Sequence, residues 1–116
     1  MINRIQVTGV LVKDQTVAHD FYANKLGLKV KVDMQMPEFR WLEVIPDGAE
    51  TSLSIMTPSP GMPAQIGGPT GIIFDTNDVK ATYEKLKAQG VKFTQEPTGQ
   101  PWGGIEARFA CGIDGV

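Results

Sequence analysis

The fold can be inferred from one stretch, VLVKDQTVAHDFYANKLGLKV at residues 10–30. Its apolar start ends at Asp14, whose carboxylate can accept hydrogen bonds from the free N–H groups at the start of a helix. Apolar residues then recur at helical spacing until Gly27, a residue type that readily adopts the left-handed conformation in which helices end. The stretch therefore predicts a strand, an amphipathic helix and a second strand.

Neighbouring segments extend this unit to a β-α-β-β-β order. Residues 5–12 are mostly apolar and predict a buried strand, whereas residues 28–34, 40–45 and 51–56 alternate apolar with polar side chains, as half-exposed strands do. Residues 58–69 hold four prolines and three glycines, which favour neither a helix nor a sheet strand. We therefore predict a connector there, after a first module at residues 1–57.

The second half repeats the order of the first. Residues 71–74 (GIIF) predict a short buried strand, Asn77 or Asp78 a helix start, and Gly90 a helix end. Further strands are predicted at residues 91–94 and 105–109. This internal duplication predicts a single α+β domain of two βαβββ modules. The second module, residues 70–116, is predicted to be truncated at its C-terminal end, because CGIDGV follows its third strand.

Composition narrows the possible partners. The 116 residues suit one domain, and a net charge of −2 with a pI near 5.3 leaves no basic stripe for nucleic acid. The single cysteine, Cys111, excludes an internal disulfide and weakly favours a reducing compartment. No apolar run has the length of a membrane span. We therefore expect a cytoplasmic protein that binds neither nucleic acid nor membrane.

The chain resembles the vicinal oxygen chelate superfamily, which includes the glyoxalases, bleomycin resistance proteins and extradiol dioxygenases. Besides the opening stretch, the segments FRWLEVIPDG, TNDVKATYEKLKAQGVKF and QEPTGQPWGGIEARF carry the resemblance, in the expected order. It implies two modules whose sheets curl around a cleft, commonly completed in a homodimer, with a metal or small molecule inside. An unpaired strand edge in the truncated module also favours a homodimer.

The resemblance also places the metal ligands of the family on this sequence. Metal-using members hold a divalent ion through His, Gln and Glu side chains. Here the corresponding positions are Val7, Ser54 and Gly71, and the fourth falls in a closing strand without a counterpart in the sequence. Glu43 is interpreted as an ordinary residue of a half-exposed strand, and His19 as a solvated helix residue. We therefore expect no metal cofactor, with a divalent metal as the alternative.

An apolar cleft for a small hydrophobic or aromatic molecule is the remaining candidate site. Aromatic and methionine side chains occupy strands and turns that the fold would direct towards the cleft, and Arg40 offers a positive charge for an anionic group. The predicted ligand-binding residues are Val7, Gly9, Met34, Met36, Phe39, Arg40, Trp41, Ser54, Met56, Gly71 and Trp102.

Three functions remain open from the sequence. The favoured one is a metal-free small-molecule-binding protein of the glyoxalase/bleomycin-resistance type, in which catalytic residues are unknown. The first alternative is a metal-dependent lyase, isomerase or dioxygenase of the same superfamily. The second alternative is an interaction module without a ligand.

Overall fold

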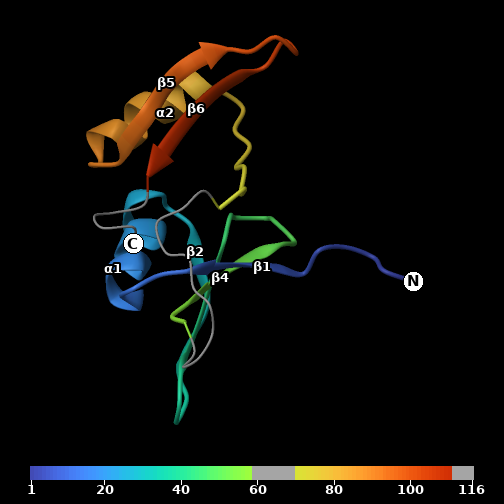
Figure 1. The fold of residues 1–116 in the computed structure, drawn as a ribbon, viewed down its shortest axis with the longest axis vertical. Helices are drawn as coiled ribbons and strands as arrows, with labels where there is room; N and C mark the ends of the chain where they lie inside the picture. Colours follow the sequence, from blue (N-terminus) through green and yellow to red (C-terminus); the bar gives the residue numbers. More distant parts are fainter. Residues whose placement is uncertain (59–69, 111–116) are drawn as a thin grey trace.

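The computed structural model describes residues 1–58 and 70–110, so the predicted connector and the last six residues lie almost wholly outside the described part. The described chain is a mixed α+β fold, which confirms the predicted fold class (Figure 1). Its elements are β1 (Val7–Leu11), α1 (Gln15–His19), the π-helix η1 (Asp20–Lys25), β2 (Lys29–Gln35), β3 (Arg40–Ile45), β4 (Ser52–Met56), α2 (Val79–Ala88), β5 (Lys92–Gly99) and β6 (Ile105–Ala110).

The helix of the first half begins where the sequence predicts it. The Asp14 carboxylate accepts hydrogen bonds from the backbone N–H groups of Thr16, at 2.8 Å, and Val17, at 3.2 Å. The helix then widens into η1, where the N–H of Leu26 donates to the carbonyl of Phe21. The chain leaves this helix through Gly27 at φ +77°, a conformation that disfavours side chains.

A four-stranded sheet in the order β1-β4-β3-β2 forms the first module. The outer pair, β1 and β4, is parallel, and the remaining pairs are antiparallel. Strand β3 spans Arg40–Ile45, the range that its alternating pattern predicts. This parallel pairing brings the first and last strands of the module together, although more than forty residues separate them.

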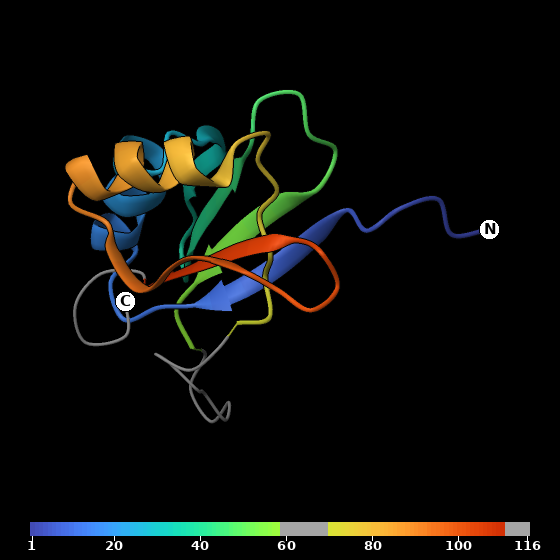
Figure 2. The same ribbon diagram turned by 90° about the horizontal axis from the view of Figure 1, so that it is seen from above.

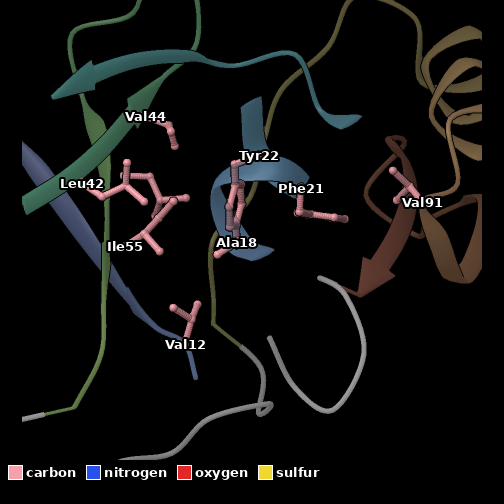
Figure 3. Close-up of a cluster of buried hydrophobic side chains, with 9 residues drawn as sticks. Val12, Ala18, Phe21, Tyr22, Leu42, Val44, Ile55 and Val91 are labelled. Atoms are coloured by element: carbon pink, nitrogen blue, oxygen red, sulfur yellow. The ribbon is translucent and has the colours of Figure 1, made fainter. Parts of the chain in front are cut away.

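One side of this sheet packs against the helix of the same module. Figure 3 shows side chains of β3 and β4 pointing towards the helix that carries Ala18, Phe21 and Tyr22. All of these positions are less than 6% exposed, and each large apolar side chain buried there contributes roughly 1.5–3 kcal/mol. The sheet residues buried on this side are Leu42, Val44, Leu53 and Ile55.

The second module consists, in its described part, of α2 and the β5–β6 hairpin. The Asp78 carboxylate caps α2 by accepting a hydrogen bond from the N–H of Ala81, and Gly90 follows the helix at φ +93°. The predicted strand at residues 71–74 is wrong, because this segment is paired with none of the described strands, Gly71 has a φ of +75° and Ile73 is 92% exposed. In the first module, β4 pairs with the equivalent strand β1, whereas no described strand offers residues 71–74 such a partner.

The two modules meet through aromatic rings. The ring of Phe109 on β6 lies 6.1 Å from that of Phe21 in η1, 5.8 Å from Phe93 and 6.1 Å from Phe74, measured between centroids. Figure 1 shows the hairpin and α2 at one end of the molecule, beyond α1, and the tips of β2 and β3 towards the other. The β5–β6 hairpin therefore contacts the helix of the first module through Phe109 and Phe21.

None of the helices in the described residues has the length and apolar composition needed to cross a membrane.

Candidate functional site

The side of the four-stranded sheet that faces away from α1 is the candidate site, and we call it the open face. Successive strand residues point to opposite sides, and residues paired in the register share a side. The pairs Gly9 with Ser54 and Met34 with Trp41 therefore point away from the buried residues. Six predicted ligand-binding residues lie on the open face: Val7, Gly9, Met34, Trp41, Ser54 and Met56.

Apolar side chains on the open face remain substantially exposed. Val7, Met34, Trp41 and Met56 are between 40% and 51% exposed, although the two central strands, β3 and β4, carry buried residues on their other side. A sheet face with this composition suits contact with an apolar surface. The open face is therefore available for a ligand or a second protein chain.

Gly9 allows Met56 to lie across the sheet. A Cβ atom built on Gly9 would be 2.8 Å from the Met56 Cε, which is closer than carbon atoms approach one another. Any other residue at position 9 would therefore displace the methionine methyl group. The absence of a side chain at Gly9 thus leaves room for the Met56 methyl group over the backbone of β1.

A carboxylate lies among these apolar groups. The Glu43 side chain lies on the open face opposite Ser54, accepting a hydrogen bond from Trp41 Nε1 at 2.7 Å and another from Ser52 Oγ at 2.6 Å. These bonds, first that from Ser52, hold the pKa of Glu43 below its ordinary value. The sequence pattern alone predicts Glu43 to be an ordinary residue of a half-exposed strand, although its spacing of two from Trp41 indicates that the two side chains share a face.

Arg40 is not part of the open face, because it precedes Trp41 by one residue and points to the opposite side. Its guanidinium donates Nε and Nη2 hydrogen bonds to Asp33, at 2.8 and 2.9 Å, and an Nη1 hydrogen bond to Thr16 at 3.1 Å. The bidentate pairing raises the pKa of Arg40 and lowers the pKa of Asp33. His19 Nε2 lies 3.9 Å from the same carboxylate. This cluster ties the helix to β2 and β3.

The remaining predicted residues lie apart from the open face. Met36 and Phe39 form the turn between β2 and β3, where the Met36 N–H donates to the Phe39 carbonyl at 2.7 Å. Gly71 precedes α2 at φ +75°, and Trp102, which is 72% exposed, lies in the turn between β5 and β6. The single described chain thus gathers six of the eleven predicted residues, and all eleven remain predictions as binding residues.

The side chains of the open face do not fit a metal ion. Val7 and Ser54 lie on the adjacent strands β1 and β4, where Val7 is paired with Ser52 and Ser54 with Gly9. An isopropyl group and a neutral hydroxyl are poor ligands for a divalent cation. Within residues 1–58 and 70–110, no three His, Cys, Asp or Glu side chains lie close enough together to hold one. Glu43 is thus a single carboxylate among apolar and neutral polar groups.

A separate shallow depression lies near the N-terminus. It is lined by Ile2, Asn3, Arg4, Gln6 and Glu50, and Figure 2 shows the residues before β1 extending away from the rest of the fold. Its lining is mainly polar and open to solvent, and most of it lies on an extended segment. Its open, mainly polar lining therefore suits a hydrophobic ligand less well than the apolar side chains of the open face do.

Comparison with known proteins supports a family assignment. Residues 3–112 match the model of the Glyoxalase/Bleomycin resistance protein/Dioxygenase superfamily. The uncharacterized proteins YetH and YurT of Bacillus subtilis strain 168 are 40% and 34% identical to the chain, over 89% and 82% of it and 86% and 81% of their own lengths.

Two solved structures have the same fold and related sequences. A superfamily member from Sphaerobacter thermophilus DSM 20745 superposes with a TM-score of 0.89 and 36% identity, over 98% of this chain and 92% of that one. TnmS3, an antibiotic binding protein from Streptomyces sp. CB03234, superposes with a TM-score of 0.85 and 37% identity, over 98% of this chain and 90% of that one.

Proposed function

Because the chain belongs to the Glyoxalase/Bleomycin resistance protein/Dioxygenase superfamily, we propose that it binds a flat hydrophobic or aromatic small molecule on the open face, without a metal cofactor. The observation that carries this proposal is the set of half-exposed apolar side chains around Trp41 and Glu43. An apolar surface with a few fixed polar groups is typical of small-molecule sites. The antibiotic-binding activity named for TnmS3 supports the same class of function.

The absence of a metal is proposed from the side chains themselves. The family positions Val7 and Ser54 lie on the open face but provide no imidazole or carboxylate. A ligand that binds the native state at 100 times its Kd stabilises it by about 2.7 kcal/mol and so raises the melting temperature. Because we propose that no divalent cation binds, adding one should leave the melting temperature unchanged. A clear rise with nickel, zinc, manganese or iron would instead favour the metal-dependent enzyme.

We also propose that the protein is a homodimer in the cytoplasm. Within the described chain the helix covers one side of the four-stranded sheet, and the open face on the other side keeps half-exposed apolar side chains. A second copy of the chain would enclose a ligand bound there. A single cysteine in the sequence is compatible with a reducing compartment. Light scattering at micromolar concentration should give twice the 12.6 kDa chain mass, and a species of 12.6 kDa alone would contradict the dimer.

Tryptophan fluorescence can locate the binding site. The chain has two tryptophans, so the Trp102→Phe variant reports from Trp41 alone and the Trp41→Phe variant reports from Trp102 alone. A panel of planar aromatic compounds is titrated into both variants, and hits are confirmed by thermal melts of the wild type. We expect a binding compound to quench the Trp41 fluorescence of the Trp102→Phe variant, with the same Kd that it has for the wild type. Quenching confined to Trp41→Phe would place the site elsewhere.

A further inference from the structure

Glu43 places a carboxylate in the middle of β3, where its register partners on the neighbouring strands are the uncharged residues Val32 and Ser54. Strand β3 places it opposite Ser54 and two residues from Trp41, and all three residues share the open face. An ionised carboxylate beside apolar groups costs free energy unless hydrogen bonds or an opposite charge compensate it. The contacts of Glu43 therefore indicate what the surface is arranged to accept.

Its two described partners are neutral. Trp41 Nε1 donates to Oε2, and Ser52 Oγ, from a residue only 1% exposed, donates to Oε1. Lys31 acts on Glu43 only from a distance, since no ion pair within 4.0 Å joins this carboxylate to a cationic side chain of the described residues. The negative charge is therefore held in place by hydrogen bonds without being paired.

The same two bonds leave capacity for a further donor. A carboxylate can accept about four hydrogen bonds, and each oxygen of Glu43 uses one with a described side chain. Of the other carboxylates on described sheet strands, Asp33 is paired with Arg40 and Glu106 with Arg108, at 2.8 and 2.7 Å, whereas Glu96 is exposed on β5, outside the four-stranded sheet. Among these strand carboxylates, Glu43 differs by lying on the open face without a cation in contact.

We infer that Glu43 selects ligands that carry a protonated amine next to a flat aromatic group. The amine would donate to the free acceptor positions of the carboxylate, and the charge-assisted bond would balance its charge. The Trp41 ring, fixed by its own bond to Glu43 and 40% exposed, lies where it can stack on the aromatic group and attract the cation. This inference rests on the proposed function and specifies its ligand class.

Two probes of similar shape test the inference. The first, 1-naphthylmethylamine, is a protonated amine at neutral pH, and the second, 1-naphthylmethanol, is neutral with the same two-ring outline. Their dissociation constants are measured by calorimetry for the wild type, Glu43→Gln and Glu106→Gln. The last variant is the matched control, because it removes a strand carboxylate that lies on β6 and is paired with Arg108.

We expect the wild type and Glu106→Gln to bind the cationic probe about tenfold or more tightly than the neutral one, as charge-assisted hydrogen bonds provide. In Glu43→Gln the preference should fall below about threefold, because the amide keeps the shape and loses the charge. Raising the salt concentration should weaken binding of the cationic probe to the wild type and leave the neutral probe unchanged. This second measurement needs no variant.

Other results would overturn the inference in distinguishable ways. Equal binding of both probes to the wild type, or an undiminished preference in Glu43→Gln, overturns the amine selection and leaves the proposed function standing. Binding of neither these probes nor any planar compound of the fluorescence panel overturns the proposed function and the inference with it. A salt-independent preference overturns the role of charge.

Discussion

The contact between Phe21 and Phe109 predicts that the two modules unfold as one cooperative unit. Phe21 is 4% exposed in η1, and its ring centroid lies 6.1 Å from that of Phe109 on β6. The planes are inclined by 37°, an arrangement in which two rings attract each other. Phe109 lies on β6 and also contacts Phe93 on β5, so the Phe21–Phe109 contact connects η1 to both strands of the hairpin.

Replacing each ring with leucine tests this coupling without opening a large cavity. Each single substitution, Phe21→Leu or Phe109→Leu, should lower the free energy of unfolding by about 1–2 kcal/mol. The ring pair itself contributes about 0.5–1.5 kcal/mol beyond the burial of area. The double variant should therefore lose less than the sum of the single losses, by about that amount.

Urea unfolding followed by circular dichroism measures these differences. With a urea dependence of about 1–3 kcal/mol per molar, each single substitution should lower the midpoint by about 0.3–2 M. Phe39→Leu combined with Phe21→Leu is the matched control, because Phe39 is 57% exposed in the β2–β3 turn. That pair should be additive within about 0.3–0.5 kcal/mol.

Two results would refute the reasoning. The first is a coupling between Phe21 and Phe109 no larger than the value for the control pair. The second is a wild-type unfolding curve with two separate transitions, because modules joined through this contact should unfold together.

Three further predictions concern single positions of the first module. Asp14→Ala should lower the free energy of unfolding by about 0.5–2 kcal/mol in urea melts, because the N–H groups of the first helical turn lose their acceptor. Gly27→Ala should cost about 1 kcal/mol in the same assay, since its φ is +77°, whereas Gly99→Ala, which lacks a positive φ and has open space around it, should cost less. Glu43 has a lowered folded-state pKa, so its stabilisation is fully present above its ordinary value of 4.5 and is lost as the pH falls through the folded value. The free energy of unfolding of the wild type relative to Glu43→Gln should therefore be constant from pH 5 to pH 7. Below about pH 4.5 the wild type should lose stability relative to Glu43→Gln in acid melts.

Much of the first module could be predicted because its signals are local. Asp14 and Gly27 act through their own backbone neighbourhood, and the alternating pattern of β3 gives its observed range of Arg40–Ile45. The π-helix could not be predicted from 3.6-residue periodicity. In this segment the Leu26 N–H donates to the Phe21 carbonyl five residues back, whereas 3.6-residue periodicity implies a bond to the residue four back.

The segment 71–74 shows why local signals are insufficient for the second module. Its apolar composition indicates burial, but a strand also needs a neighbour that accepts its backbone hydrogen bonds, and composition does not identify that neighbour. In the described residues Ile72 packs against the core without a strand forming, while Ile73 is exposed. Strand pairing is a property of the whole fold.

The alternation of side chains along a strand predicts which residues of β3 share the candidate site. Arg40 and Trp41 are adjacent on β3, so they cannot point to the same side of a regular strand, and only Trp41 lies on the open face. The same rule would have grouped Glu43 with Trp41. The hydrogen bonds that orient Glu43 depend on Ser52 of the neighbouring strand, and this pairing required the three-dimensional register.

The contact of Met56 with Gly9 also bears on how selective the protein can be. A methionine side chain has three rotatable bonds and a polarisable sulfur, so it changes shape at low energetic cost. Because Gly9 places no side chain beneath Met56, the terminal methyl group of Met56 can move aside without displacing a strand. Under the proposed function, the surface beneath a ligand is therefore adjustable, while Trp41 and Glu43 are held to each other by a hydrogen bond. Such a surface would tolerate molecules of different thickness and discriminate chiefly by their polar groups.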